Sequence, residues 1–315
     1  MPRRVAKARR LLIAAGGCAA LCVLAVLLST RATVAGMQTV HEIPFEFKTR
    51  QPIVPVNING GATVPFVVDT GASIHLIDTE IARKASVSGG RSAQMSGGGQ
   101  AAVDVQWVDG LTLETGPLSW KAQRAALASL GYPDKKHFAG LLGAPILMRY
   151  TAQFAFPTRT MRLIDPATYE PPAGAVMVPF ELQADLPVVR AKLDWGAGPV
   201  EARLMFDTGA ATVIDLNRPF VDAHRLTETM TDAKPSDRPA AIGGTAPFLY
   251  GTARRATLGT LEFERPRIGL SRAQSGSSSR SERDGIIGND LLQSFVVTVD
   301  YRRRNLVLER PRSVR

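Results

Sequence analysis

The chain has 315 residues, of which 45% are hydrophobic and 21% are charged; this composition excludes a largely disordered protein and allows one large or two medium domains. Six basic and no acidic residues lie in residues 1–36, so the net charge of +10 leaves only +4 for the rest. That remainder lacks interleaved basic and aromatic residues, and we expect no nucleic-acid partner. Both cysteines, Cys18 and Cys22, lie in residues 1–36, which excludes disulfide and thiol chemistry from the remaining chain.

Residues 1–36 are typical of a segment for export or membrane anchoring. The basic start "MPRRVAKARR" is followed by an apolar run, Leu11–Leu28, whose length lies between that of a signal-peptide core and that of a membrane-spanning helix. Basic residues before such a run keep the N-terminus in the cytoplasm and direct the rest outward. The sequence therefore favours an uncleaved signal anchor over a signal peptide that is removed near the small residues of "TRATVAG".

The chain from residue 37 onward contains the same order of features twice, which indicates a tandem duplication. The recurring segments are "IPFEF" with "VPFEL", "QPIVPVNING" with "LPVVRAKLDWG", "FVVDTGAS" with "LMFDTGAA", and "GLLGAPIL" with "GIIGNDLL". Between the two copies lies the Pro-rich stretch Asp165–Ala175, which is typical of a linker. We therefore predict an N-terminal lobe at 37–170 and a C-terminal lobe at 171–315.

Strands dominate the predicted secondary structure. Short alternating or β-branched runs bounded by Gly, Pro and Asn, such as "IVPVNINGG" and "RATLGTLEFE", indicate half-buried strands. Helical signals are few and follow each "DTGA" segment, where we interpret Asp78 and Asp215 as N-caps of short helices. The Ser- and Arg-rich stretch Ser271–Asp284 predicts a flexible, exposed loop.

Each copy also contains a glycine cluster between its "DTGA" segment and its later apolar segment. The two clusters lie in Met95–Trp107 and Ala241–Ala253, and their candidate flap glycines are Gly97, Gly98, Gly99, Gly243 and Gly244. Glycines flanked by strand-like residues suit a hinged hairpin that covers an extended peptide. A surface hairpin without a closing role is the alternative.

The paired motifs resemble a known family. "VVDTGAS" with "AGLLGAPIL", and "MFDTGAA" with "DGIIGNDLL", are similar to the two signatures of retropepsin-like aspartic proteases, and the similarity covers nearly all of residues 40–310. The resemblance implies an all-β, bilobal fold of the pepsin/retropepsin type, with two homologous β-barrel-like lobes and an active-site cleft between them. It also implies that the aspartate loop and the apolar-apolar-Gly segment lie side by side in each lobe.

Asp69 and Asp207 are the candidate catalytic residues, because each occupies the aspartate position of one motif. Two adjacent carboxylates that share one proton supply a base for water and an acid for the peptide carbonyl. The proton belongs to the pair, so neither role is given to one residue. No cofactor or metal is expected, since the histidines stand alone in the sequence. These histidines are His41, His75, His137 and His224.

The residues around the aspartates are expected to support the two loops. Gly71 and Gly209 allow tight turns that bring backbone amides near the carboxylates. By the resemblance, Thr70 and Thr208 cross-link the loops through their hydroxyls, and Gly143 and Gly288 belong to the apolar-Gly segments. Ala72 and Ala210 stand where pepsin-type enzymes usually carry a hydroxyl. Without it the shared proton is harder to remove, which predicts a pH optimum less acidic than in pepsin-like enzymes.

These features predict an aspartic endopeptidase that cleaves an extended peptide, bound by backbone hydrogen bonds as an added strand. A single chain with both aspartates is expected to act as a monomer. The anchor, the cysteine-free body and the resemblance favour a bacterial envelope, with the body in the periplasm, or else secretion after signal cleavage. The alternatives are a non-catalytic peptide-binding module on the same fold, and an assembly protein that retains a relict site.

Overall fold

The computed structural model describes residues 39–130, 138–236 and 242–311. The predicted anchor at Leu11–Leu28 lies outside these ranges, as do His137 and Ala241. Within the described ranges, none of the helices has the length and apolar character needed to cross a lipid bilayer. The chain from Gln38 onward forms a compact unit of its own.

The first copy of the repeat forms a curved sheet that closes on itself. Its strands in the described residues are β2 (Ile53–Ile58), β3 (Thr63–Val68), β4 (His75–Asp78), β5 (Ser92–Ser96), β6 (Ala102–Thr115), β7 (Leu118–Ala128) and β8 (Gly140–Leu142). They run in the order β2-β3-β8-β4-β7-β6-β5, and an additional pairing of β2 with β6 closes the barrel. We call this barrel the first lobe.

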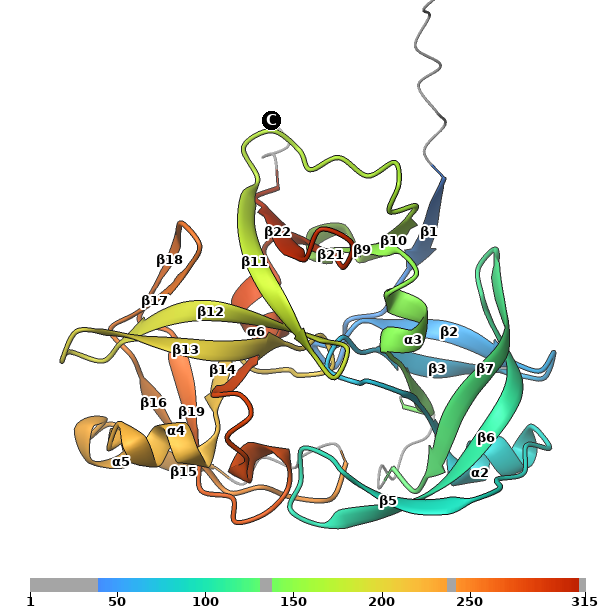
Figure 1. Ribbon diagram of the computed structural model, residues 1–315, viewed down its shortest axis with the longest axis horizontal. Helices are drawn as coiled ribbons and strands as arrows, with labels where there is room; N and C mark the ends of the chain where they lie inside the picture. The colour runs from blue at the N-terminus through green and yellow to red at the C-terminus, as the bar shows by residue number, and fades with distance from the viewer. Residues whose placement is uncertain (1–38, 131–137, 237–241, 312–315) are drawn as a thin grey trace, which may run out of the picture. The chain divides into compact units, whose positions relative to one another are not determined.

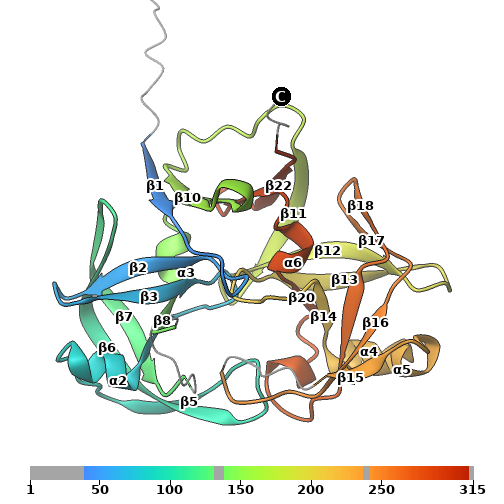
Figure 2. The ribbon, with the colours of Figure 1, turned by 180° about the vertical axis from the view of Figure 1, so that it is seen from behind.

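The second copy forms a sheet with the same local order. Its described strands are β12 (Leu186–Asp194), β13 (Pro199–Phe206), β14 (Ile214–Leu216), β15 (Lys234–Ser236), β16 (Phe248–Thr252), β17 (Arg255–Leu258), β18 (Leu261–Glu264), β19 (Arg267–Ser271) and β20 (Gly285–Ile287). The run β12-β13-β20-β14-β19 repeats the run β2-β3-β8-β4-β7 of the first lobe. We call this part the second lobe; Figures 1 and 2 show the two lobes on either side of a third layer.

That third layer is an antiparallel sheet with strands from both copies. Its strands are β1 (Val40–Pro44), β9 (Thr151–Ala155), β10 (Thr160–Ile164), β11 (Val176–Gln183), β21 (Val296–Asp300) and β22 (Asn305–Glu309). Strands β9 and β21 pair at its centre, where Gln153 Nε2 donates to Thr298 Oγ1 at 3.0 Å. Phe154, Val297 and Val299 on these strands are fully buried in a core that continues into both lobes. The predicted all-β bilobal fold is thus confirmed.

The helices are short and mostly follow the aspartate loops. They are α2 (Thr79–Lys84), α3 (Ala144–Leu147), α4 (Arg218–Ala223), α5 (Leu226–Thr229) and α6 (Asn289–Leu292), with 3₁₀ turns η1 (Phe156–Thr158) and η2 (Ser277–Ser279). Asp78 caps α2 as predicted, because its side chain accepts from the Glu80 N–H at 3.0 Å.

The prediction that Asp215 caps a helix is wrong. Asp215 lies inside β14 and accepts a hydrogen bond from Thr212 Oγ1 at 2.7 Å. Helix α4 begins three residues later, at Arg218, with Asn217 at the N-cap and a proline in its first turn. Asn217 is also the counterpart of Asp78 in the sheet, since their N–H groups bond the carbonyls of the equivalent residues Asp284 and Ala139. The dipeptide Ile-Asp thus occurs in both copies, but its aspartates, Asp78 and Asp215, do not occupy equivalent positions in the two sheets.

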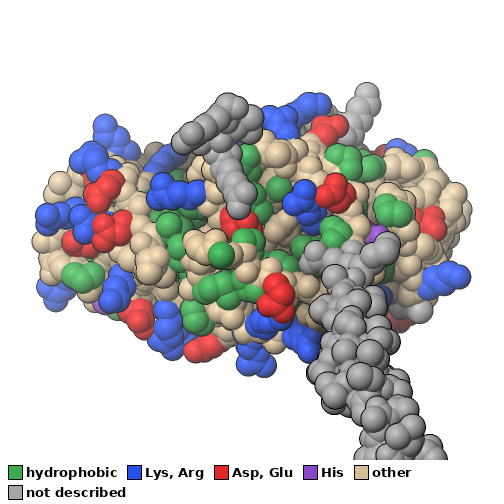
Figure 3. Space-filling model, turned by 90° about the horizontal axis from the view of Figure 1, so that it is seen from above, with side chains coloured by type: hydrophobic (Ala, Val, Ile, Leu, Met, Phe, Trp, Pro, Cys, Tyr) green, Lys and Arg blue, Asp and Glu red, His purple; other side chains and the backbone are tan. Residues whose placement is uncertain are grey.

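The Pro-rich stretch between the two copies is folded against the protein, and the face of the molecule in Figure 3 carries charges of both signs. In the Pro-rich stretch after β10, Asp165 and Thr168 form a turn and Tyr169 is buried beside Val307 and Ile164. On the face shown in Figure 3, basic and acidic side chains of the described residues are interspersed.

Candidate active site

Each candidate aspartate lies at the end of a buried central strand. Asp69 follows β3, and Asp207 follows β13. Each strand runs parallel to the strand of the later apolar-Gly motif, β3 to β8 and β13 to β20. The Asp69 N–H bonds Leu142 O at 3.0 Å, and the Asp207 N–H bonds Ile287 O at 2.9 Å. The two motifs of each copy are thus adjacent in the sheet, although 74 and 81 residues separate Gly143 and Gly288 from the aspartates.

Gly143 and Gly288 lie directly behind the two aspartate loops. A Cβ atom on Gly143 would lie 2.5 Å from Ala72 O, and one on Gly288 would lie 2.6 Å from Ala210 O. Neither backbone carbonyl can move without moving the aspartate loop. These two positions therefore need glycine because the loops approach them closely, and not because of an unusual backbone angle.

Thr70 and Thr208 join the two loops through a symmetric set of buried hydrogen bonds. The Thr70 N–H donates to Thr208 Oγ1, and the Thr208 N–H donates to Thr70 Oγ1, both at 3.0 Å. Each hydroxyl then donates to the strand that leads into the opposite loop: Thr70 to Phe206 O at 2.8 Å, and Thr208 to Val68 O at 2.6 Å. The carbonyls that accept belong to the residues just before the aspartates, so the cross-link fixes the two carboxylates relative to each other.

The carboxylates face each other across this cross-link. Each accepts a hydrogen bond at 2.8 Å from the glycine two residues on, Gly71 N–H to Asp69 Oδ1 and Gly209 N–H to Asp207 Oδ1. A Cβ on Gly71 would lie 2.5 Å from Asp207 Cγ, and a Cβ on Gly209 would lie 2.5 Å from Asp69 Cγ. The glycines thus let each carboxylate lie against the opposite loop.

The surroundings of the pair raise its proton affinity. Burial raises the pKa of Asp69 well above its ordinary value, and the negative charge of Asp207 raises it further. Burial also raises the pKa of Asp207, although a hydrogen bond from Asp69, the Gly209 N–H and the charge of Arg283 oppose the rise. Two such carboxyl groups retain one proton between them at a pH where isolated aspartates are ionised.

The two lobes support their loops differently. In the second lobe the Gly288 N–H bonds the backbone carbonyl of Val213 at 3.1 Å, whereas in the first lobe the Gly143 N–H bonds Nδ1 of His75 at 3.0 Å. His75 is fully buried, and burial together with the charge of Arg149 lowers its pKa to about 4. Its imidazole is therefore neutral, with Nδ1 as the acceptor.

Sequence reasoning missed two supporting residues. The first is His75, which stands alone in the sequence and shows no metal-ligand spacing. The second is Asn289, whose amide donates to Thr208 O at 2.7 Å and to Arg50 O at 2.8 Å, where the first lobe has Ala144. The same sequence signal could have identified both residues: when the two copies are aligned, each is a polar residue where the other copy has an apolar or small one.

The candidate flaps meet at their tips. Strands β5 and β6 form the first hairpin, with Gly97, Gly98 and Gly99 at its turn. The Gly99 N–H donates to Ile242 O at 2.7 Å, and the Ala101 N–H donates to Gly243 O at 2.9 Å. Gly243 and Gly244 have φ of +84° and +85°, in the left-handed region that favours glycine. Backbone hydrogen bonds thus join the two candidate flaps across the lobes.

Most residues of Ser271–Asp284 are exposed or half-buried, as predicted, but hydrogen bonds also tie this loop to the opposite lobe. Its Ser277 N–H donates to Gly97 O at 3.1 Å, and its Gln274 N–H donates to Gln100 Oε1 at 2.9 Å. Both acceptors belong to the flap of the first lobe. The loop is therefore held by the opposite lobe, through contacts between residues far apart in the sequence that composition does not reveal.

The sequence and the fold agree with one protein class. Residues 54–146 match the sequence model of the family described as "Aspartyl protease". The crystal structure of an aspartic proteinase from Irpex lacteus matches with a TM-score of 0.58 and 16% identity, over 86% of this chain and 97% of that one. At that identity the likeness establishes the fold alone, which is that of pepsin-like aspartic proteinases. The comparison with curated proteins returned no match.

The family match over residues 54–146 and the fold agree with the resemblance to aspartic proteases that the paired motifs predict. In the residues that the structure describes, no group of three or more His, Cys, Asp or Glu side chains is arranged to hold a metal ion.

Proposed function

We propose that the protein is an aspartic endopeptidase in which Asp69 and Asp207 activate water for peptide-bond hydrolysis. The observation that carries the proposal is the placement of each carboxylate against the opposite loop, held by its own glycine amide and by the threonine cross-link. A protein that only binds peptide has no need for two acids in one buried place. Ionising both would bring two like charges together with little water, which the raised pKa values oppose.

The shared proton defines the reaction. The ionised carboxylate of the pair takes a proton from water while the protonated one donates its proton to the carbonyl oxygen of the peptide. The water oxygen bonds to the carbonyl carbon and gives a tetrahedral diol. A proton then passes to the peptide nitrogen, the C–N bond breaks, and the two products leave with one proton again on the pair. Water and both carboxyl groups balance the reaction without a covalent intermediate.

The substrate class follows from the same architecture. The candidate flaps and the loop Ser271–Asp284 bring backbone N–H and C=O groups of both lobes together, and strands surround the aspartates. An extended peptide bound as an added strand uses such groups. Because Asp69 and Asp207 are on one chain, we propose that the monomer is active. The hydrophobic segment Leu11–Leu28 supports an exported or membrane-tethered body in the bacterial periplasm, with secretion after signal cleavage as the alternative.

Cleavage of a mixed peptide library by the purified full-length chain tests the function. Asp207→Asn keeps the shape of the side chain but removes its charge, and we expect cleavage to fall by at least about 10³-fold while the thermal unfolding transition is retained. Asp109→Asn is the matched control, because Asp109 is an exposed carboxylate paired with Arg124 far along β6. Retained binding of peptides without cleavage by the parent would instead favour the non-catalytic peptide-binding module.

A further inference from the structure

Among the described residues, Arg283 near the aspartates has no anionic partner. Arg283 is half-buried, and no described residue forms an ion pair or side-chain hydrogen bond with its guanidinium. A guanidinium removed from water is costly unless an anion or several acceptors compensate. The charge of Arg283 nevertheless acts on Asp207, so the unpaired cation lies on the aspartate side of the second lobe.

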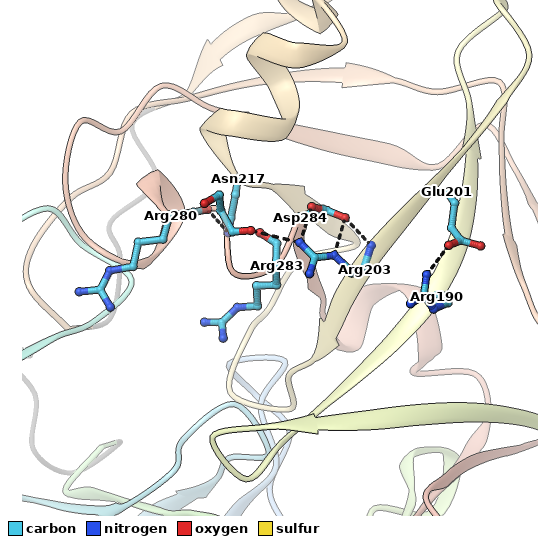
Figure 4. A network of polar contacts seen from close by, with 8 residues as sticks. Arg190, Glu201, Arg203, Asn217, Arg280, Arg283 and Asp284 are labelled. Atoms are coloured by element: carbon cyan, nitrogen blue, oxygen red, sulfur yellow. Dashed lines mark hydrogen bonds and ion pairs between the residues drawn. The ribbon is translucent and has the colours of Figure 1, made fainter.

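The backbone at Arg283 is held firmly, and its side chain is left free. Asn217 Nδ2 donates to the carbonyl oxygens of Arg280 and Arg283, at 3.2 and 3.0 Å. The next residue, Asp284, accepts hydrogen bonds from Arg203, including its backbone N–H at 2.8 Å. Figure 4 shows both loop arginines extending away from the Arg203–Asp284 pair. The side chains of Arg280 and Arg283 therefore extend to the same side of a backbone that is held in place by hydrogen bonds.

The second cation reaches the opposite lobe. Arg280 Nη2 donates to the hydroxyl of Ser96 at 2.8 Å, on the first flap. Arg283 lies nearer the aspartates and Arg280 nearer the flap. The two guanidiniums therefore lie on the second-lobe side, with Arg283 close enough for its charge to act on Asp207 and Arg280 in contact with the first flap.

The equivalent position in the first lobe is apolar. Gly140 pairs with Phe66 and Gly285 pairs with Leu204 at the same place in the two sheets, so Phe138 and Arg283 occupy equivalent positions two residues earlier. Phe138 is buried in an apolar cluster with Leu141 that includes the second-lobe residue Ile242. The two sides of the aspartate pair thus differ in polarity, one hydrophobic and one cationic.

We propose that Arg283, assisted by Arg280, binds an acidic side chain of the peptide substrate, on one side of the scissile bond, while an apolar residue contacts the first lobe on the other side. The carboxylate supplies the anion that Arg283 lacks, and a guanidinium binds it through two parallel hydrogen bonds. This specificity rests on the proposed peptidase function. It also fixes the direction in which the substrate binds, because the exchanged orientation places the acid against Phe138.

Paired peptides that differ by one Glu-to-Gln exchange at each position around the cleavage site test the proposal, with kcat/KM measured for the full-length chain. We expect the parent to prefer Glu over Gln about 10- to 100-fold at one position. Arg283→Gln should bring that ratio close to one, and Arg283→Lys should restore part of it. Arg272→Gln is the control, because it removes a charge from an exposed residue of the same loop.

The outcomes separate the specificity from the function. No cleavage of any peptide by the parent removes the peptidase function and the subsite with it. Cleavage without a Glu preference, or a preference that Arg283→Gln retains, overturns the subsite alone. A changed pH–rate profile in Arg283→Gln with an unchanged Glu/Gln ratio also overturns it, since Arg283 would then act only on Asp207. Unfolding transitions measured for both arginine variants exclude a loss of ratio through misfolding.

Discussion

Thr70 and Thr208 exchange hydrogen bonds across the two lobes, so that each hydroxyl accepts from the other's N–H and donates to the carbonyl before the opposite aspartate. Replacing Thr208 with Val keeps the shape but leaves the Thr70 N–H and Val68 O without partners. Each unpaired buried group costs about 1–3 kcal/mol. We expect Thr208→Val to lower the free energy of unfolding accordingly and to reduce kcat about 10- to 100-fold through misplaced carboxylates.

Thr208→Ser separates the hydrogen bonds from the methyl group. It retains the hydroxyl, so its kcat should stay within a few-fold of the parent while its stability falls slightly. Chemical denaturation and peptide cleavage measure the two quantities. Equal kcat values for the Val and Ser variants would contradict a positioning role for the hydroxyl.

His75 makes the first lobe sensitive to acid. Its pKa of about 4 in the folded protein lies below the ordinary value of 6.5, so the unfolded chain binds the proton more tightly. The contribution of neutral His75 to the free energy of unfolding is therefore present in full above about pH 6.5 and is lost as the pH falls toward 4. At 1.36 kcal/mol per pKa unit, this loss amounts to up to about 3 kcal/mol. Protonation also turns Nδ1 from an acceptor into a donor facing the Gly143 N–H.

His75→Asn offers an amide oxygen in place of Nδ1 and does not titrate. We expect the unfolding free energy of this variant to depend less on pH between 6.5 and 4 than that of the parent. Denaturant unfolding across this pH range measures the difference. His224→Asn is the control, because His224 lies outside the aspartate loops and makes a tilted ring contact with Phe220. Parallel pH dependences for the parent and His75→Asn would exclude His75 as the source.

The parts of the site that could be predicted are those that the duplication repeats. Asp69 and Asp207 lie in the same sequence context in the two copies, so the duplication by itself predicts that both end equivalent strands. Asp78 and Asp215 also recur as letters, yet the sheet matches Asp78 with Asn217, because one loop is longer. A sequence repeat identifies which strands and helices correspond in the two copies. Which residues are structurally equivalent is decided only by the pairing of the strands.

Contacts that differ between the copies escaped prediction for a physical reason. His75 replaces a backbone carbonyl, and the loop Ser271–Asp284 is held by a flap that precedes it by more than 170 residues. Neither interaction is local, so neither leaves a period or a turn signature in the sequence. The composition of that loop is that of a solvated segment, but its hydrogen bonds join it to the opposite lobe.

The missing hydroxyls at Ala72 and Ala210 predict the pH range of the reaction. Burial and mutual repulsion raise the pKa of the pair, so its single proton is retained to higher pH, and activity should decline only when that proton is lost. Ala72→Ser adds a donor that favours the ionised form and lowers the pKa. We expect the pH–rate profile of Ala72→Ser to move toward acid. A parent optimum in the range of pepsin, or a shift toward alkaline pH in the variant, would contradict this explanation.

The junction of the two candidate flaps gives a test of closure. A Cβ on Gly99 would lie 2.2 Å from the carbonyl carbon of Gly243, so Gly99→Ala cannot form the hydrogen bonds that join the tips. If closure holds the substrate over the aspartates, kcat/KM should fall about 10-fold or more, with little change in the unfolding transition because the tips lie outside the core. Gly90→Ala is the matched control, since its Cβ would meet only Trp107 O at an ordinary 3.4 Å. Equal kcat/KM values for the two variants would leave the hairpins as surface structure without a closing role.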